Sequence, residues 1–502
     1  MSVRPITKVL VANRGEIAVR VIRACREQGI ASVAVYSEAD REALHVLMAD
    51  EAYPIGPPPA TESYLAIEKL VAVAKAAGAD AVHPGYGFLA ENAAFAEACA
   101  AAGLVFVGPP PAAIRALGDK TAARRIAREM DVPTVPGTLA PGRSDAEARA
   151  GAREVGFPLM IKAALGGGGK GMRLVRQESE LESALRMARN EAAAAFGDGT
   201  VYLERYLAEP RHIEVQILAD AHGEVVHLGE RECSIQRRHQ KLVEESPSPL
   251  VDAPMRARMG AAACRIATAA GYQNAGTVEF LVDAERNFYF LEVNTRLQVE
   301  HPVTEMVTGI DLVREQLRIA AGEPLGYTQA DVRWRGTAIE CRINAEDPFG
   351  GWMPSPGTIT GLRAAAGPWV RDDSGVYEGC TVPRFYDTLL AKLIVWGDDR
   401  AAAIARMARA LAEYKIVGVR TTIPVLAHLM AHEDFRAGRL STHFLDRVLP
   451  ALTSRRGRLR SIAIIAAVLA DYERLGRRTL AEPPPATQGA WRWGTRQGWR
   501  PR

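Results

Sequence analysis

The 502-residue sequence has little cysteine and no long apolar run. Its six cysteines are scattered and form no C-x-x-C pair, which argues against a disulfide framework or a zinc site. No apolar run approaches the ~18 residues of a membrane helix, and the N-terminus lacks a signal-peptide pattern. These absences predict a cytoplasmic protein that does not enter a membrane.

Two nucleotide-binding fingerprints are also missing, one at the first strand–helix turn and one at the later glycine run. Strand and helix patterns alternate from Lys8 onward, which predicts an α/β fold that opens with a parallel sheet. The first strand–helix turn reads A-N-R-G-E-I-A rather than G-x-G-x-x-G, so a dinucleotide-binding dehydrogenase is disfavoured. No Walker A motif, G-K-[ST] opening a helix, follows the later glycine run.

A glycine run is nevertheless present between two apolar segments. A strand carrying Lys162 leads into Gly166–Gly169, and a second strand follows at 172–175. Glycines let backbone N–H groups approach a phosphate closely. We expect a hairpin that covers phosphate; a flexible linker is the alternative interpretation.

Residues 276–302 carry the densest polar pattern. Two β-patterned runs flank the turn 283–287, which predicts a hairpin. If the second run stays extended as far as Pro302, five polar residues spaced by two share one face: Glu292, Asn294, Arg296, Gln298 and Glu300. Glu279 and Glu292 on neighbouring strands, with Asn294 beside them, predict hard oxygen ligands for Mg²⁺. A solvated strand face is the alternative.

Charge is uneven along the chain. Arg237, Arg238, His239 and Lys241 lie close together, with Arg231 just before them, and this pattern favours an anion site over a merely solvated run. Residues 451–502 hold eleven arginines and three acidic residues, so the rest of the chain is net negative. Such a body does not predict nucleic-acid binding.

Several long motifs together resemble biotin carboxylase, the ATP-grasp component of biotin-dependent carboxylases, over residues 6 to about 447. They read V-A-N-R-G-E-I-A-V-R-V-I-R-A-C, H-P-G-Y-G-F-L-A-E-N, G-G-G-G-K-G-M-R, R-E-C-S-I-Q-R-R-H-Q-K, E-V-N-T-R-L-Q-V-E-H-P-V-T-E and E-C-R-I-N-A-E-D-P.

The resemblance implies an α/β chain built around an ATP-grasp fold. It implies a parallel α/β domain before the ATP-grasp domain (1–117), the ATP-grasp domain (118–334) with a mobile lid at about 134–207, and a C-terminal α+β domain of the biotin carboxylase type (335–447). Residues 448–502 lie beyond the resemblance, and their composition predicts a basic tail with a helix and a Trp/Arg-rich end. The implied reaction uses ATP, Mg²⁺ or Mn²⁺, and bicarbonate to form carboxyphosphate, which then carboxylates N1′ of biotin.

Site residues also follow from the resemblance. The implied ATP contacts are Lys120 and Lys162 on phosphates, Gly168 and Gly169 over them, Glu204, Arg205, Tyr206 and Leu207 near adenine, and His212, Gln236 and His239 lining the site. The implied metal ligands are Glu279, Glu292 and Asn294.

The remaining implied roles concern bicarbonate and biotin. Lys241, Arg296, Gln298 and Val299 are expected to bind bicarbonate, Glu300 to deprotonate it, and Arg342 to stabilise the biotin enolate, so the catalytic set is Arg296, Glu300, Lys241 and Arg342. One departure is Leu165, which stands where the family usually has the first of five glycines.

No A-M-K-M biotin-attachment motif occurs. The biotin is therefore expected on a separate carrier protein, the carboxyltransferase is expected to be a separate protein too, and a homodimer or larger complex is expected. An acyl-CoA carboxylase of the acetyl- or propionyl-CoA type is the predicted context. A pyruvate, 2-oxoglutarate or urea carboxylase, or a catalytically silent scaffold with the same fold, remains open.

Overall fold

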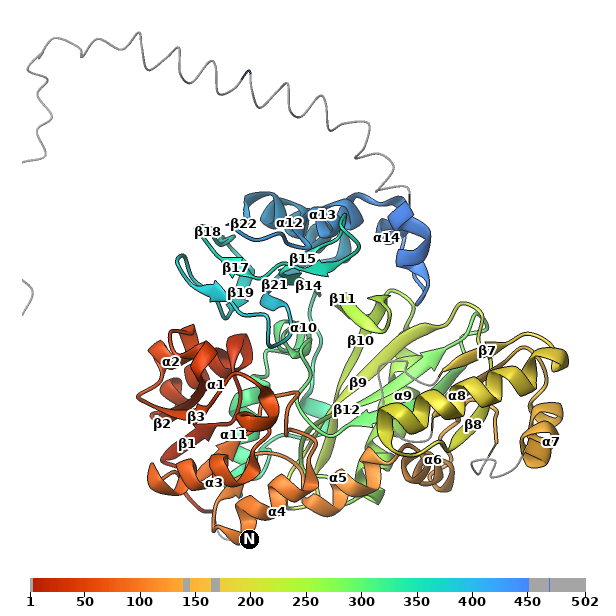
Figure 1. The fold of residues 1–502 in the computed structure, drawn as a ribbon, viewed down its shortest axis with the longest axis horizontal. Coiled ribbons are helices and arrows are strands. Elements are labelled where there is room, and N and C mark those ends of the chain that lie inside the picture. The colour runs from red at the N-terminus through yellow and green to blue at the C-terminus, as the bar shows by residue number, and fades with distance from the viewer. Residues whose placement is uncertain (1–2, 139–144, 164–171, 451–468, 470–502) are drawn as a thin grey trace, which may run out of the picture. The chain divides into compact units, whose positions relative to one another are not determined.

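The computed structural model describes residues 3–138, 145–163, 172–450 and 469 (Figure 1). Its contacts group into two units, Met1–Asp446 and Arg447–Arg502. The predicted glycine cover, Gly168 and Gly169, and most of the predicted tail lie outside the described residues. Among the described residues, none of the helices has both the length and the apolar character needed to cross a membrane.

The N-terminal part is a five-stranded parallel sheet in the order β3-β2-β1-β4-β5, as the alternating pattern predicts. Its strands are β1 Lys8–Val11, β2 Ala31–Ser37, β3 Glu51–Gly56, β4 Ala81–His83 and β5 Val105–Phe106. Its helices are α1 Gly15–Glu27, α2 Leu44–Met48, α3 Ile67–Ala76, α4 Ala93–Ala101 and α5 Pro111–Gly118, and short 3₁₀ turns occupy Glu38–Asp40 and Ala60–Glu62.

A small antiparallel sheet, β7-β6-β8, follows helix α6 (Lys120–Glu129). Asp119 caps α6 by accepting a hydrogen bond from the Ala122 N–H, which fixes Lys120 in the first turn. The other elements of this region are α7 Asp145–Val155, β6 Leu159–Ala163, β7 Arg173–Val175, a 3₁₀ turn at Glu178–Glu180, α8 Leu181–Phe196 and β8 Val201–Arg205.

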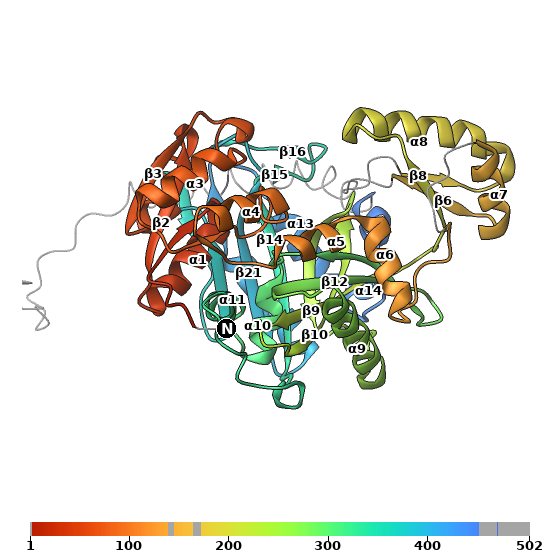
Figure 2. The ribbon, with the colours of Figure 1, turned by 90° about the horizontal axis from the view of Figure 1, so that it is seen from below.

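An eight-stranded antiparallel sheet forms the centre of the described fold, in the order β13-β12-β9-β10-β11-β14-β21-β19. Its strands are β9 Arg211–Ala219, β10 Val225–Arg237, β11 Gln240–Ser246, β12 Asn274–Val282, β13 Phe288–Asn294, β14 Thr337–Asn344, β19 Val370–Ser374 and β21 Leu389–Gly397. Helix α9 (Ala253–Ala269) packs against β9 and β10 (Figure 2).

The remaining elements surround the second half of this sheet. They are α10 His301–Thr308, α11 Leu312–Ala320, a 3₁₀ turn at Gln329–Asp331, β15 Glu346–Asp347, β16 Met353–Pro354, β17 Gly357–Thr358, β18 Gly361–Arg363, β20 Thr381–Val382, α12 Arg400–Glu413, β22 Lys415–Val417, α13 Ile423–Ala431 and α14 Glu433–Arg436.

The predicted hairpin is confirmed, but the extended run is shorter than predicted. Strands β12 and β13 pair antiparallel, and Glu279 lies opposite Glu292. Strand β13 ends at Asn294, and helix α10 begins at His301. Pro302 sits in the first helical turn, where its fixed φ and missing N–H cost nothing, rather than prolonging the strand. The prediction that five side chains share one strand face is therefore wrong beyond Asn294.

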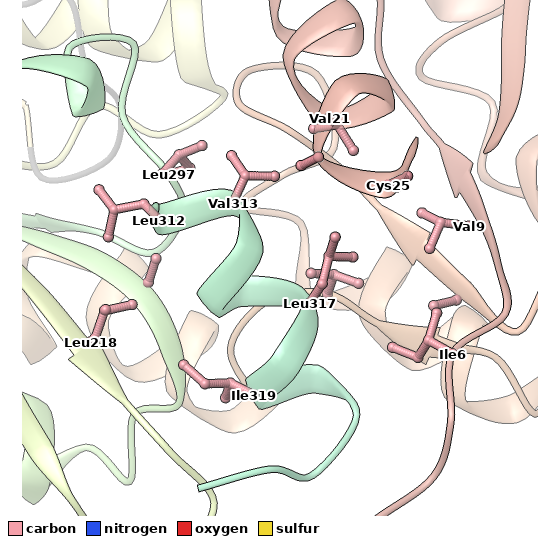
Figure 3. Packing of buried hydrophobic residues seen from close by; sticks show 14 of the residues in the cluster. Ile6, Val9, Val21, Cys25, Leu218, Leu297, Leu312, Val313, Leu317 and Ile319 are labelled. Atoms are coloured by element: carbon pink, nitrogen blue, oxygen red, sulfur yellow. The ribbon is translucent and has the colours of Figure 1, made fainter. Parts of the chain in front are cut away.

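A hydrophobic cluster fixes the chain where it leaves β13. Leu297 is fully buried together with Leu312 and Val313 of α11 and Val21 of α1 (Figure 3). Burying a leucine side chain is worth about 1.5–3 kcal/mol. This anchor holds the loop 295–300 between the N-terminal sheet and the eight-stranded sheet.

Candidate active site

One cavity of about 900 Å³ lies among the N-terminal part, the small sheet and the eight-stranded sheet. Sixteen amino acids from Lys120 to Val299, together with Arg342, were predicted site residues and line it: Lys120, Lys162, Glu204, Arg205, Tyr206, Leu207, His212, Gln236, His239, Lys241, Glu279, Glu292, Asn294, Arg296, Gln298, Val299 and Arg342. Glu300 lies behind this wall and is fully buried. The fold therefore brings together residues that the sequence predicts for the site.

Two lysines enter the cavity from separate elements. Lys120, in the first turn of α6, forms an ion pair with Glu292 at 2.9 Å. Lys162, on β6, lies 2.5 Å from the carboxylate of Glu204 on β8. Each lysine therefore has a carboxylate partner that a phosphate oxygen can replace.

The turn between β10 and β11 carries His239 to the cavity. Arg238 and His239 both have positive φ, at 48° and 67°. A two-residue hairpin turn of this kind requires that conformation at both central positions, which non-glycine residues adopt at a cost. Such local strain is concentrated at functional sites in proteins.

Glu279 is the centre of one hydrogen-bond network. Its Oε1 accepts hydrogen bonds from Lys241 (3.0 Å), Asn294 (2.8 Å) and Gln298 (3.0 Å), and its Oε2 lies 2.9 Å from His212 Nε2. Burial alone would raise the pKa of Glu279, but the charges of Lys241 and His212 outweigh it and lower the pKa. Glu279 is therefore an ionised carboxylate at neutral pH.

Glu300 is the centre of a second network. Its two oxygens lie 2.6 Å from Lys241 Nζ and 2.8 Å from Arg342 Nη2. Burial acts to raise the pKa of Glu300, but Lys241 and Arg342 outweigh it and hold the pKa well below 4.5. Burial acts to lower the pKa of Lys241, but the carboxylates of Glu214, Glu279 and Glu300 outweigh it and raise the pKa. Lys241 and Glu300 are therefore both charged at neutral pH.

Arg296 is held from three sides. Its Nε donates to Glu91 at 2.8 Å, and its Nη atoms donate to Asn294 (2.9 Å) and Gln298 (3.0 Å). Glu91, which belongs to the N-terminal part, was missed as a site residue. The one signal available was its place inside the motif H-P-G-Y-G-F-L-A-E-N.

Arg231 does not belong to the predicted anion site. Its guanidinium is fully buried and donates to Glu214 (2.5 Å), Gln216 (2.7 Å) and Thr304 (3.0 Å). Glu214 and Gln216 on β9 accept hydrogen bonds from this arginine, because a buried guanidinium needs all its donors paired. Glu214, which also lies 2.5 Å from Lys241, is a second residue that sequence reasoning left without a role.

The carboxylates fit a hard divalent cation. Glu279 and Glu292 are cross-strand partners, Asn294 is two residues beyond, and all three offer oxygen. Among the described residues, tighter groups of possible ligands are His212, Glu214 and Glu279, and Glu214, Cys233 and Glu300. The first group shares Glu279 with the predicted set, whereas the second contains a thiol, which suits a softer metal than Mg²⁺.

Known protein families and relatives match this chain over most of its length. Family models match at residues 5–114 (biotin carboxylase, N-terminal domain), 119–328 (carbamoyl-phosphate synthase L chain, ATP binding domain) and 340–447 (biotin carboxylase C-terminal domain). A pyruvate carboxylase subunit of Methanothermobacter thermautotrophicus is 56% identical over 88% of this chain and 89% of its own length. The propionyl-CoA carboxylase alpha chain of Ruegeria pomeroyi is 51% identical over 88% and 68%.

A solved structure matches as well. It is the biotin carboxylase domain dimer of the Hydrogenobacter thermophilus 2-oxoglutarate carboxylase, in complex with MgADP, ADP and bicarbonate. The sequences are 50% identical, the TM-score is 0.85, and the match covers 88% of this chain and 97% of that one.

Proposed function

The chain belongs to the biotin carboxylase family of ATP-dependent ligases, and we propose that it is the biotin carboxylase subunit of a multi-subunit acyl-CoA carboxylase. The observation that carries the reaction is the buried Glu300 between Lys241 and Arg342, which line the same cavity as Lys120 and Lys162. In the proposed reaction, bicarbonate gives its proton to Glu300 and attacks the γ-phosphate of ATP, and ADP leaves. Carboxyphosphate then delivers its carboxyl group to N1′ of carrier-bound biotin, and inorganic phosphate leaves with the N1′ proton.

The nucleotide end of the cavity supplies the positioning. Lys120 and Lys162 bind phosphate oxygens in place of Glu292 and Glu204, and the strand end Glu204–Leu207 meets the adenine through backbone groups, with His212, Gln236 and His239 alongside. Glu279 and Glu292, with Asn294 beside them, would hold Mg²⁺ or Mn²⁺, which supplies positive charge that neutralises phosphoryl oxygens.

The bicarbonate end supplies the chemistry of the first step. Arg296 presents a planar guanidinium to a planar anion, and Gln298 and the Val299 backbone complete the cradle. Glu300 accepts the bicarbonate proton. Lys241 and Arg342 lower the pKa of Glu300 in the free protein. Glu300 can therefore accept the proton only when bound anions weaken its pairing with these two cations.

Arg342 serves the second step. Its guanidinium stabilises negative charge on the ureido oxygen of biotin as N1′ is deprotonated. Glu244, 2.6 Å from Arg342, keeps the guanidinium in place when Glu300 takes up a proton. The intact set of Lys241, Arg296, Glu300 and Arg342 argues against a silent scaffold.

The acyl-CoA assignment is the finer part of the proposal. The propionyl-CoA carboxylase alpha chain supports it, whereas the relatives from a pyruvate carboxylase and a 2-oxoglutarate carboxylase favour a keto-acid acceptor as the second candidate. The partners would be a biotin carboxyl carrier protein and a carboxyltransferase, and the dimeric relative supports a homodimer.

The test is ATP hydrolysis that depends on bicarbonate and is stimulated by free biotin. Hydrolysis that ignores bicarbonate would refute the carboxylase function. Mixing the chain with its co-purified carrier and transferase, and offering acetyl-CoA, propionyl-CoA, pyruvate or 2-oxoglutarate with labelled bicarbonate, separates the two acceptor classes.

A further inference from the structure

Lys392 lies fully buried on β21, directly opposite Arg342 of β14 in the antiparallel register. Cross-strand partners present their side chains on the same face of a sheet. Arg342 Nη2 lies 2.8 Å from the Glu300 carboxylate, and Lys392 Nζ donates to the Val299 carbonyl oxygen at 2.9 Å. Two neighbouring cations therefore hold consecutive residues. Arg342 holds the side chain of Glu300, and Lys392 holds the peptide that joins Glu300 to Val299.

The ammonium group of Lys392 is tied to other parts of the chain. It lies 3.1 Å from Glu16 Oε2 on α1 and 3.9 Å from Asp373 Oδ2 on β19. Glu16 in turn accepts a hydrogen bond from the Tyr86 hydroxyl. One buried charge thus connects the N-terminal part, the loop after β13 and the far end of the eight-stranded sheet.

Stability is a weak explanation for this arrangement. Desolvating an ammonium group costs several kcal/mol, and a buried ion pair often stabilises a fold no better than apolar side chains of similar volume. The Val299 carbonyl could be satisfied by a neutral donor. The turn that it belongs to is loosely bonded, because the His301 N–H to Gln298 and Val303 N–H to Glu300 backbone bonds are 3.4 and 3.3 Å long.

We propose that Lys392 is a positioning residue for the bicarbonate step: by holding the Val299–Glu300 peptide, it sets where the Glu300 carboxylate and the Val299 backbone stand toward bicarbonate. The inference rests on the function proposed above. A displacement of about 1 Å in such a group can cost about 10²-fold in rate.

Lys392→Met tests the proposal, because methionine keeps an unbranched chain and loses both charge and donor. We expect kcat for bicarbonate-dependent ATP cleavage to fall by about 10²-fold and KM for bicarbonate to rise, while KM for ATP changes less than about threefold. Lys392→Arg, which restores charge and donors, should recover most of the lost rate. A purely structural role would instead shift both KM values together.

Lys8→Met is the matched control. Lys8 also pairs with a carboxylate, Glu51 at 2.7 Å, and donates to a backbone carbonyl, that of Ala77 at 2.9 Å, but it does not line the cavity. Its kinetic constants should stay at the wild-type values.

Should Lys392→Met fail to fold, Lys392→Gln keeps a donor without the charge and should give an intermediate loss. Either variant retaining more than half of the wild-type kcat, or raising KM for ATP in parallel with KM for bicarbonate, overturns the proposal. If the wild-type protein itself lacks bicarbonate-dependent ATP cleavage, the proposed function has failed. Hydrogen exchange at residues 297–303 still tests whether Lys392 holds the Val299–Glu300 peptide. Faster exchange in the folded variant supports this role, and unchanged exchange refutes it.

Discussion

Replacing Glu300 by Gln removes the proposed proton acceptor and leaves the surrounding cluster paired. Lys241 keeps Glu214 at 2.5 Å and Glu279 at 3.0 Å, and Arg342 keeps Glu244 at 2.6 Å, so no cation is left buried without a carboxylate. We therefore expect a folded protein with near-normal ATP affinity. Loss of a general base costs about 10²–10⁴-fold in rate, which corresponds to about 3–5 kcal/mol in the barrier.

The assay for Glu300→Gln is coupled ADP release at saturating MgATP, with and without bicarbonate, beside a direct measurement of ATP binding. Glu346→Gln is the matched control, because Glu346 lines the same cavity and accepts a hydrogen bond from Thr388 at 2.6 Å, away from the Lys241–Arg342 cluster. The control should keep most of its activity. If Glu300→Gln retains more than half of the bicarbonate-dependent rate, Glu300 is not the base.

Three further outcomes follow from the same contacts. Arg342→Ala should slow carboxylation of free biotin more than biotin-independent ATP cleavage, and equal losses would assign Arg342 to the first step or to the fold. Glu292→Gln should raise the Mg²⁺ concentration that gives half-maximal ATP cleavage by about tenfold or more, since one of two carboxylate ligands is lost, and an unchanged value would remove Glu292 from the metal site. Burial raises the pKa of Asp372 from 3.8 to about 6, so the stability that this carboxyl contributes, at most about 3 kcal/mol, is full below pH 3.8 and is lost as the pH rises through 6. Asp372→Asn should flatten Tm over that window, and a Tm profile like that of the wild type would contradict the shift.

The sequence predicts local patterns well and long-range pairings poorly. The hairpin follows from period-two alternation on both sides of a short turn, but a bulge between Glu279 and Phe280 shifts the register and sets Glu279 opposite Glu292. The end of β13 was missed because Pro302 fits either an extended chain or a first helical turn, and tertiary packing of Leu297 decides between them. Only the fold shows that Glu91, more than 200 residues earlier, holds Arg296.

Lys392 carries a sequence signal for a buried, paired lysine. It is the one charged residue in the strand L-L-A-K-L-I-V-W-G, where every neighbour is apolar or small. Buried lysines are rare unless paired, so a lone lysine in such a strand already predicts partners. Their identity, Glu16 and the Val299 carbonyl, depends on the packing of three distant segments.

The eight-stranded sheet bears on how this chain can be divided. Strand β11 pairs with β14 across the segment that separates the matched ATP-binding region, ending at 328, from the matched C-terminal region, starting at 340. A fragment that stops between residues 328 and 340 would lack most or all of β14. The backbone N–H and C=O groups of β11 would then lie along a free edge, which is a template for aggregation. The recombinant boundary that preserves a soluble protein should therefore fall after α14, and the two halves, expressed apart, should recover activity only when they are refolded together.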